Sequence, residues 1–466
     1  MTPYSVSFER GKDRTPFELS AGTHFRFDFD QFERFFQKPL PDRWLDLLRI
    51  AAGIYAVDRL SRRRQRDQRR FWSRTLRLSV GVIDPNFWSQ GDVLESLTET
   101  LEFLSDDTWD LTFKKDDKRS RREQQLFMFN ESDNNLICLY SGGLDSAAGL
   151  ANRVAEDPTR EILPVTVWHQ PIQRKSVRKQ FAMLGGRYRV QITPLIVKSA
   201  LIWTPELKSR FREEPTQRGR SFLFTAAGAI ATAMAGGSET ELYESGIGAI
   251  NLPLMSGMVG SRTTRSAHPE FLRRMSKLVG RVIARPMSFV LPFEQLTKGQ
   301  VLAQARGAGL DELVKTTVSC VHYPLRESEA KQCGACPACI FRRQSLTVAG
   351  LHEPAGTYRY DLFENADASN QVPPKELDYL KAFLDQVVHL DGIRENQPFP
   401  LRIRRHLIGT GVLADGESGE IVSRLLRTYR DEWRETVAQA QGRGISWTKL
   451  LGRRASLTEG ATNAVA

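Results

Sequence analysis

The sequence predicts an α/β protein built on a doubly wound parallel sheet, with an N-terminal α+β extension and a C-terminal helical appendage. From Leu136 onward, short apolar runs alternate with segments of helical periodicity, which is typical of a parallel sheet covered by helices on both faces. The first of these runs leads into a turn with two consecutive glycines, where such a chain passes from strand to helix. Neither feature recurs toward the two ends of the chain, which we therefore expect to form regions of their own.

Length and composition fit this organisation. The 466 residues suffice for two or three domains, and 41% hydrophobic with 26% charged residues is ordinary for a soluble globular protein. We expect an N-terminal extension over 1–130, a central domain over 131–350 and a helical region over 351–466. No apolar run approaches the ~20 residues of a membrane span, and no signal-peptide pattern opens the sequence, so we expect a cytoplasmic protein without a membrane partner. Almost all of the net charge of +11 lies between residues 131 and 350, which favours polyanion binding there.

The N-terminal extension contains both helical and strand patterns. Apolar residues at helical spacing predict a helix over 44–60. Alternating apolar residues over 76–82 and 109–113 predict strands of one antiparallel unit. The charged stretch 114–123 predicts the linker to the central domain.

An arginine-rich stretch follows the predicted helix at residues 62–74 and includes Phe71 and Trp72. A basic run with adjacent aromatics can grip single-stranded nucleic acid. We favour a solvated helix face, because the extension as a whole is nearly neutral.

The glycine turn of the central domain is the most informative stretch, and it reads Ser141-Gly142-Gly143-Leu144-Asp145-Ser146. The apolar run 136–140 suits a buried strand, the glycines permit a tight turn, and Asp145 or Ser146 can cap the following helix. Free amides at a helix N-terminus bind phosphate, and the hydroxyls of Ser141 and Ser146 add two donors. The segment therefore predicts a nucleoside triphosphate site. The alternative is an ordinary strand-to-helix turn.

This turn resembles the pyrophosphate-binding loop (PP-loop) of the ATP pyrophosphatases, which adenylate a substrate oxygen and release pyrophosphate. The resemblance implies an adenine nucleotide alpha-hydrolase-like fold with ATP and Mg²⁺ as cofactors. The sequence contains no Gly-x-x-x-x-Gly-Lys-Ser/Thr, so it does not suggest cleavage between the β- and γ-phosphates.

The remaining elements of the central domain follow in alternation. We expect strands at 162–168, 190–197, 242–245 and 286–291, and helices near 174–184, 219–235, 268–281 and 297–307. Ligands of such sheets bind beyond the carboxyl ends of the strands, where Trp168-His169-Gln170 and Glu244-Ser245-Gly246 should converge with the turn. We expect His169 and Gly246 to contact the nucleotide, with a purely structural role as the alternative for His169. Arg220, at the start of a helix, can reach a phosphate, unless it is a surface arginine.

Four of the five cysteines lie within twenty residues, at positions 320, 333, 336 and 339. Four thiolates at these spacings suit one tetrahedral Zn²⁺ in a closed, structural site, with an iron–sulfur cluster as the alternative. The site would clamp the loop at Cys320 against the helix that begins near Pro337. Cys138 stands apart in the central strand, where we expect a small buried residue.

These features together resemble the 7-cyano-7-deazaguanine synthases, the QueC-like family, over about 135–350. The glycine turn, Gly219-Arg220, Leu296-Thr297-Lys298 and the four cysteines occur in that order. Members use ATP to convert 7-carboxy-7-deazaguanine and ammonia to a nitrile, through an adenylated carboxylate and an amide, on the route to queuosine-type bases. The resemblance implies that residues 141–146 bind ATP phosphates and magnesium, that Asp145, Lys298 and Arg220 serve catalysis, and that Cys320, Cys333, Cys336 and Cys339 hold zinc.

The sequence departs from this family in two places. Where a Tyr-Pro-Asp-Cys-Arg-Pro-Glu-like segment is expected near the substrate, residues 264–270 read Thr-Arg-Ser-Ala-His-Pro-Glu. Ordinary members also lack regions such as 1–130 and 351–466, whereas long relatives occur in bacterial anti-phage defence clusters, including the Qat type. In that branch the base can be joined to a protein amine, so we expect a protein partner from the same gene cluster.

The C-terminal region shows helical spacing over 377–388 and 421–433, and its last ten residues are expected to be disordered. We expect this region to hold a partner. Three functions therefore stand beside each other: a ligase acting on a deazapurine carboxylate, a nucleic-acid-binding defence component with a nucleotide switch, and a transfer-RNA-modifying enzyme. We favour the first and rank the third last, because one metal would occupy every cysteine except Cys138. Without a spare exposed thiol to hydrolyse glutamine, the amine must come from elsewhere.

Overall fold

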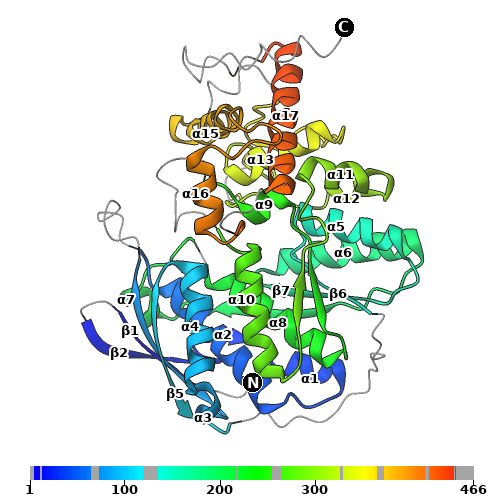
Figure 1. Ribbon diagram of the computed structural model, residues 1–466. Coiled ribbons are helices and arrows are strands. Elements are labelled where there is room, and N and C mark those ends of the chain that lie inside the picture. The colour runs from blue at the N-terminus through cyan, green and yellow to red at the C-terminus, as the bar shows by residue number, and fades with distance from the viewer. Residues whose placement is uncertain are drawn as a thin grey trace.

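The computed structural model describes residues 5–10, 13–63, 73–118, 135–216, 218–253, 264–325, 329–364, 372–414, 419–445 and 447. Its centre is a six-stranded sheet in the order β10-β9-β6-β7-β8-β3 (Figure 1). The strands are β3 (Phe25–Phe27), β6 (Leu136–Leu139), β7 (Ile162–Trp168), β8 (Leu195–Leu201), β9 (Glu239–Leu242) and β10 (Ser288–Val290). All neighbouring pairs are parallel except β3 and β8, which are antiparallel. The predicted parallel α/β sheet is therefore confirmed.

Two strands differ from the positions expected from the sequence. The strand β9 ends at Leu242, where the predicted strand begins, so residues 243–245 lie beyond its carboxyl end. The sequence of β9 is partly polar, so it lacks the apolar pattern expected of a buried strand. Its nearly buried Glu241 is neutralised by Arg153 at 2.8 Å. The strand β8 starts at Leu195, five residues later than expected.

Helices cover both faces of this sheet (Figure 1). Along β6, Ile137 belongs to one hydrophobic core, whereas Leu136 and Cys138 belong to the other. The first core contains α1 (Asp30–Phe36), α2 (Asp42–Leu60), α4 (Gly91–Ser105), α7 (Pro205–Arg210), α8 (Gly219–Met234) and α10 (Pro269–Ile283). The second contains α5 (Leu144–Glu156), α6 (Pro171–Tyr188), α11 (Lys298–Gly307), α12 (Leu310–Val314) and part of α13 (Pro337–Val348).

The N-terminal extension forms a second sheet in the order β2-β1-β4-β5. Its strands are β1 (Ser5–Arg10), β2 (Asp13–Ser20), β4 (Thr75–Val82) and β5 (Thr108–Lys115), and α3 (Pro85–Trp88) and α4 join the last two. The prediction of an antiparallel pair for 76–82 and 109–113 is wrong, because β4 and β5 are parallel. The two strands are parallel because the helix α4 between them carries the chain back to the end of the sheet at which β4 begins, as a crossover connection.

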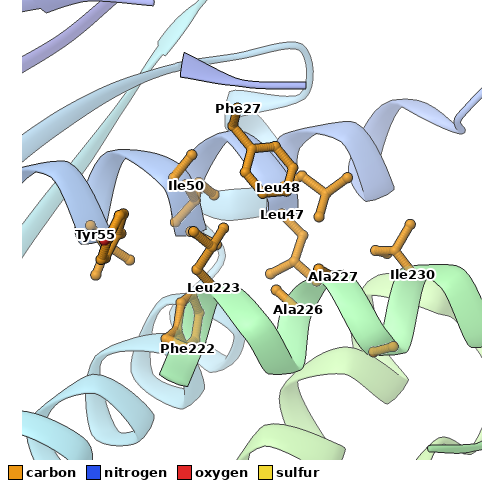
Figure 2. Packing of buried hydrophobic residues seen from close by; sticks show 14 of the residues in the cluster. Phe27, Leu47, Leu48, Ile50, Tyr55, Phe222, Leu223, Ala226, Ala227 and Ile230 are labelled. Atoms are coloured by element: carbon orange, nitrogen blue, oxygen red, sulfur yellow. The ribbon is translucent and has the colours of Figure 1, made fainter. Parts of the chain in front are cut away.

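The N-terminal extension shares its core with the central domain. Figure 2 shows α2 lying along α8, with Leu47 and Ile50 facing Leu223 and Ala226. The strand β3 also extends the central sheet through its pairing with β8. The boundary expected near residue 130 therefore divides the sequence, but not the hydrophobic core. Half of the expected linker, residues 119–123, lies outside the described residues, and its first two residues belong to β5.

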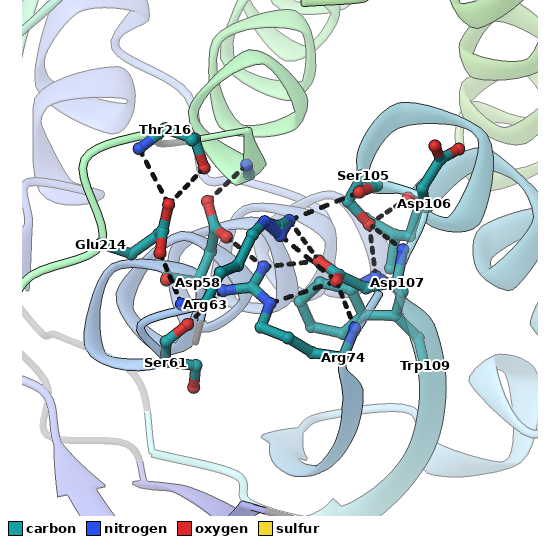
Figure 3. Close-up of polar contacts among 12 residues, drawn as sticks. Asp58, Ser61, Arg63, Arg74, Ser105, Asp106, Asp107, Trp109, Glu214 and Thr216 are labelled. Atoms are coloured by element: carbon teal, nitrogen blue, oxygen red, sulfur yellow. Dashed lines mark hydrogen bonds and ion pairs between the residues drawn. The ribbon is translucent and has the colours of Figure 1, made fainter. Parts of the chain in front are cut away.

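A buried network of charges joins the same two regions (Figure 3). Arg63 is 5% exposed and donates to Asp107 at 2.7 Å. The prediction that Arg63 lies on a solvated helix face is therefore wrong. Arg74 bonds Asp58 at 2.6 Å, and Asp58 in turn accepts from the backbone N–H of Gly219 at 2.8 Å. The N-terminal extension therefore caps the first turn of α8. Residues 64–72, the rest of the arginine-rich stretch, lie outside the described residues.

The C-terminal region forms a third core with α15 (Pro374–Leu390), α16 (Leu401–Gly409) and α17 (Glu420–Gly442). The predicted helical segments lie within α15 and α17. The helix α17 packs on α13 and on the short helix α9 (Gly246–Ile250), which places this region beside the end of the central sheet (Figure 1). Within the part of the chain described, no helix is both long and apolar enough to cross a membrane. The last ten residues lie outside the described ranges.

Candidate active site

A cavity of about 430 Å³ lies at the carboxyl ends of β6 and β9. The turn after β6 and the start of α5 form one side, and Glu244 and α9 follow from β9. The first residues of α11 and α13 and the side chains of α15 and α17 complete the wall. Neighbouring strand ends are where ligands of doubly wound sheets bind, and the volume suits a small-molecule ligand.

The glycine turn is held in shape by its own serines. The Ser146 hydroxyl accepts from the backbone N–H of Ser141 at 3.2 Å and lies 3.0 Å from the Ser141 hydroxyl. Gly142 has φ +79°, and a Cβ there would come within 2.7 Å of the Val177 side chain, so only glycine fits. Ser141, Gly143, Leu144 and Asp145 line the cavity, whereas Gly142 and Ser146 support them from behind.

Lys298 and Asp145 form an ion pair on the cavity wall. Their Nζ and Oδ2 atoms are 2.9 Å apart, and the lysine side chain is only 8% exposed. Lys298 is the first residue of α11 and Thr297 caps this helix, so the chain direction there is fixed. The ammonium also lies 4.4 Å from the centre of the Phe341 ring. The pair places a nearly buried cation beside the first turn of α5, where a phosphate would bind.

Glu244 is a further carboxylate in this wall. Burial, and then the negative charge of Asp145, raises its pKa to about 8. The carboxylate packs against Gly248, where any Cβ would collide with it. Residues 244–246 were expected at the site, with Gly246 as the residue that contacts the nucleotide. A carboxylate two residues beyond the end of a strand was the signal that could have identified Glu244.

Gly246 has a structural place instead. Its N–H donates to the carbonyl of Leu296 at 2.9 Å, and a Cβ would collide with the carbonyl of Glu294. Gly246 is not one of the described residues that line the cavity. Its contact holds α9 against the segment that leads to Lys298.

His169 and Arg220 also lie outside the cavity lining, within the packing of α2 on α8. The His169 ring stacks on Tyr55 at 5.4 Å and on Phe224 at 5.9 Å, and its Nδ1 lies 2.9 Å from the carbonyl of Ser199. The Arg220 guanidinium lies 4.8 Å from the centre of the Phe224 ring. Neither side chain belongs to the cavity lining, because α2 of the N-terminal extension packs on this side. The backbone of His169 does lie near the turn: its N–H donates to the Gln173 side chain at 3.4 Å, which in turn donates to the carbonyl of Ser141 at 3.3 Å.

The four clustered cysteines form a compact, buried group. Their sulfur atoms lie within 4.8 Å of one another, and Cys333 and Cys339 are 3.9 Å apart. Zn–S bonds of ~2.3 Å in a tetrahedron place sulfurs about 3.8 Å apart, so the group fits zinc. Backbone N–H groups point at the Cys320 and Cys333 sulfurs, both at 3.3 Å, as suits thiolates. Cys138 is fully buried in β6, as expected.

The cysteine cluster adjoins the cavity directly. Val318 and Ser319, immediately before Cys320, line the cavity, and so do Pro337 and Ala338, which lie between two other cysteines. A bound zinc would fix both segments and hence the shape of this wall.

Residues 265–350 match a family model described as queuosine biosynthesis protein QueC. A 7-cyano-7-deazaguanine synthase from Anaeromyxobacter sp. (strain Fw109-5) is 32% identical over 91 residues. The chain is QueC-like over this region. The alignment spans 18% of this chain and 36% of that relative. The QueC-like region includes Lys298 and all four clustered cysteines, whereas the glycine turn precedes it.

Proposed function

We propose that the protein is an ATP-dependent synthase that adenylates a 7-carboxy-7-deazaguanine-type carboxylate and couples it to an amine. The observation that carries this proposal is the Lys298–Asp145 ion pair, which faces the cavity. The glycine turn lines one side of this cavity, and aromatic side chains line the opposite side. Lys298 also lies inside the QueC-like region.

In the proposed reaction, a carboxylate oxygen of the base attacks the α-phosphorus of ATP, and pyrophosphate leaves. The amides and hydroxyl of residues 141–146 bind the phosphates, and Lys298 neutralises charge that develops on the leaving pyrophosphate. Asp145 and Glu244 would supply carboxylate oxygens, the ligands that Mg²⁺ prefers. A cation bound between Glu244 and Asp145 would lower the raised pKa of Glu244 and relieve the repulsion between the two carboxylates. When bound, Mg²⁺ would offset phosphate charge.

The proposed second step is attack of an amine on the carbonyl carbon, with loss of AMP. The chain has five cysteines, of which four lie in the cluster and Cys138 is buried, so none is placed to release ammonia from glutamine. We propose that the amine is free ammonia or an amino group of a partner protein from an anti-phage gene cluster. An α-amino group, which titrates near pH 8, is the better protein nucleophile.

The test is to incubate the full chain with ATP, Mg²⁺ and 7-carboxy-7-deazaguanine, with either ammonium or the proteins of neighbouring genes. We expect pyrophosphate release that requires the base, and either a base-derived amide or nitrile or a base-sized adduct on a partner by intact mass. Asp145→Asn should abolish release. Salt-dependent binding of nucleic acid without any pyrophosphate release would favour a nucleotide-switched binding protein instead.

A further inference from the structure

The C-terminal helices build the far wall of the cavity, opposite the glycine turn. By the resemblance described above, ordinary QueC-like proteins lack this C-terminal region. Phe383 and Gln386 come from α15, Tyr429 comes from α17, and Phe341 of α13 lies between them. The Phe341 ring centre is 6.3 Å from that of Phe383 and 6.0 Å from that of Tyr429. This end of the cavity is aromatic, whereas the opposite end carries the charged groups described above.

Gln386 brings the polar group of this aromatic end. Its side chain is 9% exposed, and its amide donates to the carbonyls of Leu252 and Pro253 at 3.3 and 3.4 Å. Its oxygen accepts from the Tyr429 hydroxyl at 3.4 Å. All three bonds are longer than the usual 2.7–3.2 Å, so a ligand that offers shorter bonds can replace them.

The segment expected near the substrate, residues 264–270, is committed to another task. Arg265 pairs with Asp106 at 2.8 Å, and its guanidinium lies 4.8 Å from the centre of the Phe103 ring, both at the end of α4. His268 is 1% exposed and caps α10 by accepting from the N–H of Glu270 at 3.2 Å. Of this segment, Thr264 lines the cavity.

Resting on the proposed function, we propose that Phe383, Gln386 and Tyr429 form the site for the heterocyclic ring of the carboxylate substrate. A planar ring packs against the aromatic side chains. A carboxamide has a donor and an acceptor side by side, which matches the adjacent C=O and N–H of a lactam edge in a bidentate pair. A ring held there directs its carboxylate toward Lys298 and the glycine turn. The C-terminal helices thus determine substrate specificity.

The experiment measures binding of two probes to the full chain by calorimetry. The probes are 7-carboxy-7-deazaguanine and the magnesium complex of α,β-methylene-ATP, which cannot release pyrophosphate. We expect Gln386→Leu to weaken binding of the base about tenfold or more, because two hydrogen bonds are lost, while binding of the nucleotide changes less than about twofold. Gln397→Leu, the same change at an exposed position of this region, should alter neither affinity.

A second, milder variant distinguishes a loss of base binding from misfolding of the Gln386→Leu protein. Tyr429→Phe removes one hydroxyl that orients Gln386, and we expect it to weaken binding of the base about threefold or more. Unchanged affinity for the base in both Gln386→Leu and Tyr429→Phe would overturn this inference and leave the proposed function intact. Absence of both base binding and base-dependent pyrophosphate release in the unaltered protein would overturn the two together.

Discussion

Lys298 is the residue on which the proposed chemistry depends most directly. Its ammonium is nearly buried, paired with Asp145 at 2.9 Å and in contact with the Phe341 ring. A cation held in a water-poor site stabilises developing negative charge more than it would in water.

We predict that Lys298→Met lowers the rate of base-dependent pyrophosphate release about 100-fold or more. Methionine keeps most of the volume, so the midpoint of thermal unfolding should change little. Lys277→Met, at an exposed position of α10, serves as the matched control and should have unaltered activity. Equal activity in both variants would show that the lysine is structural.

His169 has a measurable consequence for stability rather than for catalysis. Burial of the ring, and then the nearby charge of Arg220, lowers its pKa to about 3. In the unfolded chain a histidine titrates near pH 6.5. Between about pH 3 and 6.5, therefore, the unfolded chain binds a proton that the folded protein excludes, and stability rises with pH.

We predict that His169→Phe, which keeps a ring between Tyr55 and Phe224, removes this contribution. The free energy of unfolding, measured by urea denaturation from pH 4 to 7, should rise less steeply in the variant, by up to ~1.4 kcal/mol per pH unit. Above pH 6.5 the two proteins should show parallel curves. The same slope in both proteins below pH 6 would mean that the histidine titrates normally.

At the scale of elements, α17 supports the helix that carries the lysine. The Thr297 hydroxyl, which caps α11, also donates to the Glu432 carboxylate of α17. Burial raises the pKa of Glu432 to about 7. Gly299 permits this approach, since its Cβ would lie 2.6 Å from Glu432. The C-terminal region thus fixes the position of Lys298 as well as the far wall.

We predict that Thr297→Val lowers stability by ~1 kcal/mol through loss of the cap, and lowers the turnover number as well. Thr204→Val removes the equivalent cap from α7, which contributes no residue to the cavity lining, and provides the comparison. Chemical denaturation and pyrophosphate release measured on both variants separate the two effects. Equal losses of stability and of activity in the two variants would contradict the role of Thr297 in positioning Lys298.

Element types followed from the sequence more readily than their pairing. Alternating apolar residues located β4 and β5, but alternation carries no information on strand direction, and the intervening helix α4 made them parallel. Likewise, β9 was expected three residues too late, because its Glu241 is neutralised by an arginine distant in sequence.

At the scale of the whole molecule, the central domain and the C-terminal region together line one cavity. Residues 141–146, Lys298 and the cysteine cluster were predictable, because turn chemistry and ligand spacing are local properties of the chain. Phe383, Gln386 and Tyr429 were not, because their spacing is that of any amphipathic helix and their role depends on how the helices pack. The place of the His169 and Arg220 side chains outside the cavity lining was not predictable either, because the helix α2 that packs on them comes from the N-terminal extension.

The cysteine cluster is a local motif that should affect the stability of the whole protein. We predict one zinc per chain and that Cys336→Ser loses the metal and destabilises the protein, because a structural zinc contributes its binding energy to folding. Elemental analysis and thermal unfolding provide the measurements. Cys138→Ser, which alters a buried thiol away from the cluster, should retain zinc. A metal-free Cys336→Ser protein of unchanged stability would contradict this prediction.

The proposed adenylation makes one demand on the fate of an oxygen atom. The oxygen that attacks the α-phosphorus remains on phosphorus when the amine displaces AMP. The direct measurement uses 7-carboxy-7-deazaguanine with ¹⁸O in its carboxylate, unlabelled ATP and an amine, followed by mass spectrometry of the nucleotide product. We predict AMP that carries one ¹⁸O atom. Unlabelled AMP, or ADP and phosphate as the products, would contradict carboxylate activation at this site.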